Sequence, residues 1–231
     1  MATRFYFNLA IDPTGVGNTP IQTASWNLPA TLVAWSFLES KTAVSAASIL
    51  NNSTTTTIPI TTTQNIMVNA FLSTPLSLGG SISGTFSLVI RAFQNATTNN
   101  ATLAVVVSVV SNDFSINRGT LYSNLNADTA FPLSASAATR SINAGTITPV
   151  TSFGGDRVMV EIGAHVAAPS ASGSFNLRYG ESAATDFALT SALTTDLNPW
   201  CEFSQDLLGS RLENYKSIRV GNGMSTGERI R

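Results

Sequence analysis

Hydrophobic and polar residues alternate with a period of two along most of this chain. Apolar residues recur at every second position, with few exceptions, over residues 82–91, 157–166 and 174–179. Successive side chains of a β-strand point to opposite faces, so each stretch predicts a strand with one buried face. The same pattern predicts further strands in three segments: residues 4–12, 31–38 and 65–72.

Two segments carry extra information about their place in a sheet. Residues 103–110 are apolar on both faces, which predicts a central strand. Pro59 lies in the threonine-rich residues 54–63, and it confines that segment to a sheet edge or a loop because proline cannot donate to a ladder. Residues 41–50 and 182–193 could each hold a short helical turn, although their serine and threonine content weakens a helix.

The strands and the turn clusters between them predict an all-β fold. Eight or more strands at this spacing favour a two-sheet antiparallel β-sandwich of jelly-roll-like topology. A chain of 231 residues can form such a sandwich as a single domain. We expect the sandwich to span residues 1–205 and an extended C-terminal arm to span residues 206–231.

The arm is set apart by its charge. Residues 206–231 hold eight charged side chains, five basic and three acidic, together with four glycines. Such a terminus is often frayed. The alternative, which we prefer, is an arm that binds a partner or a neighbouring subunit, because 26 extended residues reach roughly 85 Å. The expected partner-binding residues are Leu208, Arg211, Leu212, Tyr215, Lys216, Ile218 and Arg219.

Composition excludes several classes of protein. Only 11% of the residues are charged and the net charge is −1, which argues against electrostatic binding of nucleic acid. Polarity comes instead from 28 Ser, 29 Thr and 19 Asn, while a 43% hydrophobic content excludes a disordered chain. A single Cys and a single His exclude an internal disulfide and Cys- or His-rich metal centres, so we expect no cofactor.

Catalytic constellations are not indicated by the sequence. His165 is the only candidate base for a nucleophile, and Glu161 lies on the same face of the predicted strand. Gly-x-Ser-x-Gly is absent, so we interpret His165 as a structural or surface residue. We interpret Cys201 as a small buried hydrophobe and Asp156, after two glycines, as a turn residue. No enzyme is expected.

Two tryptophans allow a different kind of binding. Trp26 and Trp200 lie beside asparagine or proline, where exposed indoles could stack on sugar rings. A role in the core or in anchoring a loop is the preferred interpretation. No apolar run resembles a signal peptide or a membrane helix, so we expect synthesis in a cytoplasm without a signal peptide.

Several short motifs together resemble small structural proteins of tailed bacteriophages. They lie at residues 1–7 (MATRFYF), 110–113 (VSND), 118–121 (RGTL), 155–163 (GDRVMVEIG), 178–180 (RYG), 184–186 (ATD) and 198–203 (NPWCEF). The resemblance spans most of residues 1–205 and does not extend to the arm. It implies a virion component made in the host cytoplasm, and it brings no catalytic motif.

Two functions follow as hypotheses. The first is a capsid decoration (cement) protein on the capsid exterior that binds the major capsid protein and itself, as a homo-oligomer such as a trimer, and stabilises the shell. The alternative is a tail-associated or surface-displayed carbohydrate-binding module for host recognition. Neither hypothesis involves nucleic acid or a membrane as partner.

Overall fold

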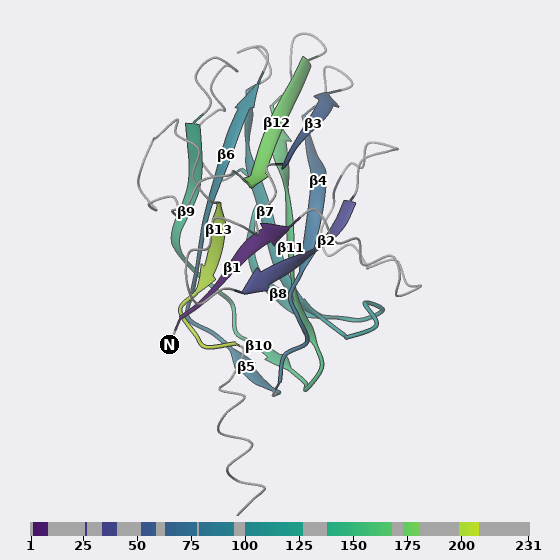
Figure 1. Ribbon diagram of the computed structural model, residues 1–231, viewed down its shortest axis with the longest axis vertical. Helices are drawn as coiled ribbons and strands as arrows, with labels where there is room; N and C mark the ends of the chain where they lie inside the picture. The colour runs from purple at the N-terminus through teal and green to yellow at the C-terminus, as the bar shows by residue number, and fades with distance from the viewer. Residues whose placement is uncertain are drawn as a thin grey trace, which may run out of the picture.

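The computed structural model describes residues 2–8, 26, 34–40, 52–58, 63–77, 79–94, 100–126, 138–167, 173–180 and 199–207. These residues contain thirteen strands and no helix, which confirms the all-β fold class (Figure 1). The strands are β1 (Thr3–Asn8), β2 (Ala34–Ser40), β3 (Asn52–Ile58), β4 (Gln64–Leu72), β5 (Gly80–Ile82), β6 (Thr85–Gln94), β7 (Ala101–Val110), β8 (Asn117–Asn124), β9 (Ala138–Thr146), β10 (Val150–Ser152), β11 (Arg157–Val166), β12 (Gly173–Gly180) and β13 (Trp200–Phe203).

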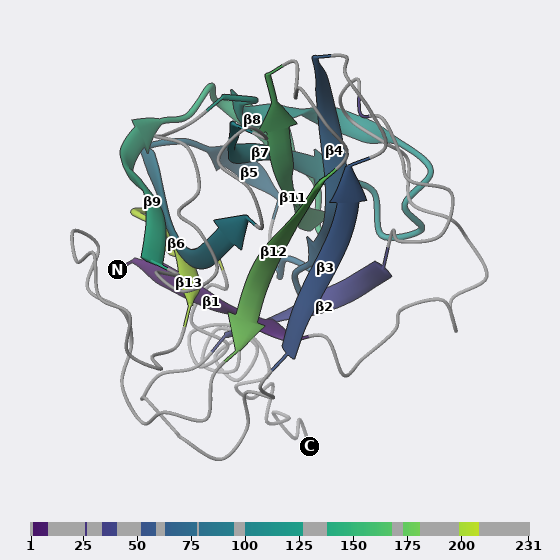
Figure 2. The same cartoon turned by 90° about the horizontal axis from the view of Figure 1, so that it is seen from above.

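Eleven strands form one continuous, curled sheet. Its order is β3-β12-β6-β13-β1-β2-β4-β11-β7-β8, and β9 also pairs with β6. The sheet curls so that its two halves face each other across a shared core, as in a sandwich (Figure 2). β5 and β10 form a separate two-stranded sheet. The pairs are antiparallel apart from β2 and β4, which run parallel, a departure from the antiparallel pairing that we expected.

The main core lies between the two halves of the large sheet. Phe5 of β1, Phe86 of β6 and Phe203 of β13 are fully buried, and the ring of Phe203 contacts the rings of the other two. The ring centroids of Phe5 and Phe203 are 6.1 Å apart, and those of Phe86 and Phe203 are 5.2 Å apart. Aliphatic side chains from β4, β7 and β11 complete this cluster from the opposite half. Alternate residues of each strand therefore point inward, as the period-two pattern predicts.

The half formed by β4, β11 and β7 is buried on its other face as well. A second cluster there contains Met67 of β4, Val106 of β7 and Met159 of β11, together with Trp26 and Phe114. β7 pairs with β11 on one side and with β8 on the other, so the central strand predicted over residues 103–110 is confirmed.

Other expectations about elements have mixed outcomes. β3 lies at the end of the sheet order, so the edge position predicted near Pro59 is confirmed for Asn52–Ile58. The stretch predicted as one strand over residues 82–91 is divided into β5 and β6, because Gly84 between them has a φ of 102°. The possible helical turns at residues 41–50 and 182–193 lie outside the described residues.

One glycine is required by close packing between strands. The register of β11 against β4 shifts between Ile162 and Gly163, which marks a β-bulge. A Cβ atom at Gly163 would collide with the backbone carbonyl of Ile66 on β4. Backbone atoms cannot rotate away as a long side chain can, so this position accepts only glycine without a shift of the ladder.

Replacing Gly163 by alanine should therefore destabilise the fold by about 2–4 kcal/mol, because the added methyl group overpacks the β4–β11 ladder. Urea unfolding followed by tryptophan fluorescence measures the loss. Gly154→Ala is the matched control, since its Cβ would meet only the Ser77 carbonyl oxygen at 3.9 Å, an ordinary contact. Equal unfolding midpoints for both variants would contradict this account of Gly163.

Candidate interaction surface at the β5–β10 end

Four segments meet at one end of the molecule, which we call the β5–β10 end. They are the small sheet of β5 and β10, the loop at residues 111–116, the turn at residues 153–156 and the segment at residues 204–207. β5 and β10 lie at the lower end of the molecule in Figure 1. β5 pairs with β10 through Ile82–Val150 and Gly80–Ser152, and the Ser152 hydroxyl donates to the Gly80 carbonyl at 3.0 Å.

The turn at residues 153–156 is held by the buried carboxylate of Asp156. Asp156 Oδ2 accepts the backbone N–H of Phe153 at 2.8 Å, and the backbone N–H of Asp156 donates to the Phe153 carbonyl at 3.0 Å. The backbone N–H of Leu76 donates to the Asp156 carbonyl, and the backbone N–H of Gly155 donates to the Leu76 carbonyl. Asp156 is therefore a turn residue, as predicted.

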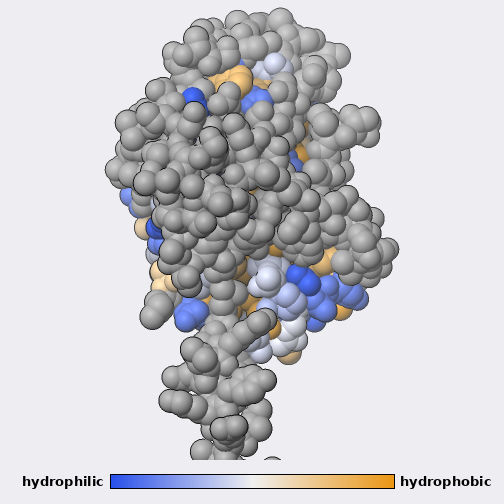
Figure 3. Space-filling view, in the orientation of Figure 1, coloured by the Kyte–Doolittle hydropathy of each residue, from blue (hydrophilic) through white to orange (hydrophobic). Residues whose placement is uncertain are grey.

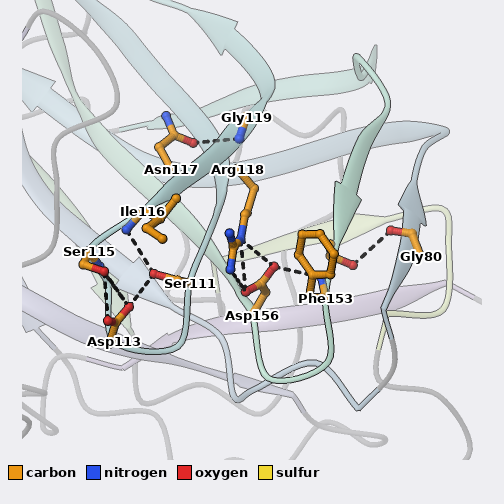
Figure 4. A network of polar contacts seen from close by, with 11 residues as sticks. Gly80, Ser111, Asp113, Ser115, Ile116, Asn117, Arg118, Gly119, Phe153 and Asp156 are labelled. Atoms are coloured by element: carbon orange, nitrogen blue, oxygen red, sulfur yellow. Dashed lines mark hydrogen bonds and ion pairs between the residues drawn. The ribbon is translucent and has the colours of Figure 1, made fainter.

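Arg118 links this turn to β8. Its Nε atom lies 3.1 Å from Asp156 Oδ2, and Figure 4 shows the guanidinium facing both carboxylate oxygens. Arg118 also stacks on Phe153, with its Cζ atom 4.9 Å from the ring centroid. The Phe153 side chain remains 56% exposed. A rigid turn thus presents a large aromatic ring at the surface.

The loop at residues 111–116 is tied by its own hydroxyl groups. The backbone N–H groups of Ser111 and Phe114 donate to the carbonyls of Ile116 and Ser111, both at 2.9 Å. The Asp113 carboxylate accepts hydrogen bonds from the hydroxyls of Ser111 and Ser115 (Figure 4). The Ser111 hydroxyl in turn accepts a hydrogen bond from the Ile116 N–H at 3.0 Å. These hydrogen bonds hold the pKa of Asp113 below its usual value, and the bond from Ser111 contributes most to that lowering.

A buried ring fastens the same loop to the body. Phe114 is fully buried although its φ is 63°, an unusual conformation for a large side chain. Arg157 lies above it, with Cζ 5.5 Å from the ring centroid, and donates to the Ser73 carbonyl at 2.7 Å. Burial lowers the pKa of Arg157. The loop leaves Ile116 49% exposed.

Residues 204–207 form what we call the C-terminal clamp. The backbone N–H of Ser204 donates to the Thr85 carbonyl at 3.0 Å, and the backbone N–H of Thr85 donates to the Ser204 hydroxyl at 2.9 Å. The Gln205 amide accepts the N–H of Ser83 at 2.8 Å and donates to the Ser81 carbonyl at 3.1 Å. Residues 204 and 205 are thus hydrogen-bonded to β5, to β6 and to the residues between them, and the boundary expected at residue 205 stays a prediction.

Leu207 completes the clamp. It is buried, and its N–H donates to the Thr3 hydroxyl at 2.8 Å. A pocket of about 210 Å³ lies between the clamp and the small sheet, lined among others by Ser81, Ser152 and Gln205. Among the described residues of its lining, Asp206 is the only one with an ionisable side chain. The residues expected to bind partners begin directly after Leu207 and lie outside the described residues.

The two tryptophans do not offer open ring faces. Trp26 is 7% exposed and Trp200 is 3% exposed. The Arg4 guanidinium covers Trp200, with Cζ 3.9 Å from the ring centroid, and it pairs with Glu202 at 2.9 Å. Sugar stacking needs a free ring face, so these positions remove the support for the carbohydrate-binding alternative and agree with a role in the core.

The residues considered for catalysis differ in how deeply they are buried. Glu161 is fully buried, while His165 is half-buried with Nδ1 2.8 Å from Asn65 Oδ1. Cys201 is fully buried, and its pKa is raised, first by desolvation and then by Glu202, so the thiol stays protonated. The prediction of a buried cysteine is confirmed.

The described part of the chain contains neither a metal-binding cluster nor a membrane-spanning helix. No group of three or more His, Cys, Asp or Glu side chains there is placed to hold a metal ion. Nor does that part contain a helix with the length and apolar character needed to cross a membrane.

Comparison with known proteins gives only distant structural similarity. No protein-family model and no curated protein matches the sequence. Among solved structures, a CocE/NonD family hydrolase from Staphylococcus aureus is 10% identical at a TM-score of 0.44, covering 89% of this chain and 36% of that one.

Two structures of infectious bursal disease virus are also similar. The Gx strain is 12% identical at a TM-score of 0.25, covering 79% of this chain and 40% of that chain. The Gt strain is 10% identical at a TM-score of 0.30, with 79% and 41% covered. This chain therefore spans well under half the length of all three neighbours. Their TM-scores lie below 0.5, so we draw nothing about function from them.

Sequence reasoning missed the principal features of the β5–β10 end. Phe153 and Ile116 are the exposed large hydrophobic residues among those described, and neither stood out in the sequence. The one available signal was Phe153 directly before Gly154, Gly155 and Asp156, a turn composition that places an apolar residue at a loop.

Replacing Asp156 by asparagine should destabilise the protein by about 1–3 kcal/mol. The substitution removes the buried negative charge that pairs with Arg118 and accepts the hydrogen bond of the Phe153 N–H. Urea unfolding of D156N, of Arg118→Met and of the double variant gives the coupling energy. Strictly additive effects would show that the two side chains do not act together.

Replacing Ser111 by alanine should raise the pKa of Asp113 towards its ordinary value near 4, because the largest cause of its lowering is lost. Since the pKa of Asp113 is lowered on folding, its contribution to stability is present above that ordinary value and is lost as pH falls through the lowered one. NMR titration of the Asp113 carboxyl carbon measures the shift. Ser123→Ala, on the far part of β8, is the control, and an unchanged pKa in S111A would be inconsistent with this assignment.

Proposed function

We propose that this chain is a non-enzymatic structural protein of a bacteriophage virion, namely a capsid decoration protein that binds the major capsid protein and stabilises the shell. The motifs at residues 1–7, 155–163 and 198–203, among others, support a virion component. The observation that carries the proposal is the β5–β10 end, where both exposed large apolar side chains of the described residues lie. Exposed apolar side chains at one end favour contact with another protein.

The polar composition suits repeated contact between subunits. Serine, threonine and asparagine supply hydrogen bonds at a smaller desolvation cost than charged groups. A subunit with 11% charged residues can therefore meet neutral protein surfaces without leaving many buried charges unpaired. We propose that the chain also associates with itself, as a trimer, on the shell exterior, where many copies strengthen each weak contact through avidity.

Cryo-electron microscopy of virions with and without this chain tests the proposal. We expect tens of copies or more per particle on the outer surface of the shell, and a lower temperature of shell disruption in particles that lack the chain. A few copies confined to the tail would refute a decoration role. Particles reconstituted with an unrelated β-sandwich of similar size provide the control for non-specific adsorption.

A further inference from the structure

The pocket between the C-terminal clamp and the small sheet is sized for a small ligand. Its described lining comes from residues 76–79, β5, the end of β10 and residues 205–207, and its volume is about 210 Å³. Pockets for drug-sized ligands measure roughly 300–1,000 Å³. A cavity of about 150 Å³ accommodates benzene, so this pocket suits a ligand of about six to eight non-hydrogen atoms.

The inner wall of the pocket is apolar. Leu76, Ile82 and Leu207 belong to its lining, and each of them is at most 7% exposed. Ser152 is the other buried residue of the described lining, and its hydroxyl donates its proton to the Gly80 carbonyl at 3.0 Å. The interior therefore favours an aliphatic group, which gains free energy by leaving water.

The hydrogen-bond donors around the pocket are largely used within the protein. The Gln205 amide nitrogen donates to the Ser81 carbonyl at 3.1 Å, and its oxygen accepts the Ser83 N–H at 2.8 Å. The Leu207 N–H donates to the Thr3 hydroxyl. A sugar or another polyol needs donors as well as acceptors. The lining therefore suits a ligand that brings its own donors.

The charge at the mouth of the pocket is negative. Asp206 is exposed, and it is the only ionisable residue in the described lining. Its carboxylate attracts a cation and repels an anion. In the space-filling view, the described residues at this end form a mixed surface, with apolar areas beside hydrophilic ones (Figure 3). Such a surface fits a ligand with one apolar and one charged part.

From these observations we propose that the pocket binds a primary ammonium group carried on a short aliphatic chain. The chain lies against Leu76, Ile82 and Leu207, and the ammonium group donates charge-assisted hydrogen bonds to Asp206 at the mouth. A free alkylamine and the first residue of a protein chain, where that residue is aliphatic, share this chemistry. The site belongs to the isolated chain and does not depend on the proposed decoration role.

NMR titration of the isotope-labelled, full-length protein tests the site. The probes are propylammonium, butylammonium and pentylammonium at about pH 6.5, where amines are protonated. We expect saturable shifts of the backbone N–H signals of residues 79–82, 152 and 205–207. Each added methylene should tighten binding by up to about fourfold while the chain still fits the pocket, and octylammonium should bring no further gain.

An uncharged probe and a matched pair of variants isolate the charge. Pentanol should bind the wild type more weakly than pentylammonium does. Asp206→Asn should weaken pentylammonium binding by roughly twofold to fivefold, as for an exposed ion pair, and should leave pentanol binding unchanged. Asp113→Asn is the control, because it makes the same change at an exposed carboxylate outside the described lining, and it should bind both probes as the wild type does.

Three outcomes overturn the proposal. The first is the absence of saturable shifts in the lining with every amine, and the second is equal binding of pentanol and pentylammonium by the wild type. The third is a shift of the same signals by methyl glucoside and not by the amines, which would make the pocket a polyol site.

Leucine amide distinguishes the two sources of the ligand, because its ammonium group lies beside an aliphatic side chain as at the start of a protein chain. Binding as tight as that of butylammonium, with the same signals shifted, assigns the pocket to a protein N-terminus. Binding of the alkylammonium probes alone assigns it to a free amine. Either result supports recognition of an aliphatic ammonium group.

Discussion

The pairing of β11 with β7 is the constraint on which the rest of the structure depends. Ten consecutive residue pairs join the two strands, from Arg157–Val110 to Val166–Ala101, and apolar clusters cover both faces. This register places the end of β7 beside the start of β11. The loop at residues 111–116 and the turn at residues 153–156 therefore emerge together, although about forty residues separate them in the chain. The position of the β5–β10 end is thus a consequence of strand register in the core.

The sequence predicts the elements of this fold better than their arrangement. Strands β4, β11 and β12 can be predicted from the alternation of apolar and polar residues, and β7 from apolar residues on both faces, because a buried face requires apolar side chains at every second position. The parallel pairing of β2 with β4 and the contact between Arg118 and Asp156 leave no such mark, since they depend on segments that meet only after folding. The same holds for the exposure of Phe153, which residue type does not suggest, whereas the burial of Trp26 and Trp200 agrees with the core role preferred from the sequence.

The abundance of serine has a specific structural use at this end of the molecule. The hydroxyls of Ser111 and Ser204 accept the backbone N–H groups of Ile116 and of Thr85, and the Ser115 hydroxyl donates to the Asp113 carboxylate. Short hydroxyl side chains thereby satisfy backbone hydrogen-bonding groups, as the strand ladders do within the sheet. A chain with few charges can consequently hold rigid loops at its surface, and rigid loops are what a contact with another protein requires.

The C-terminal clamp also determines how the body responds to mechanical load. β13, which directly precedes the clamp, is paired on one side with β6 and on the other with β1. A pull on the arm would act along β13 and load both ladders lengthwise, so that their hydrogen bonds share the tension and do not open one after another. Because Leu207 is also bonded to Thr3, part of the force passes directly to the first strand of the chain. A load applied beyond Leu207 would therefore reach the middle of the large sheet, where β13 and β1 lie side by side.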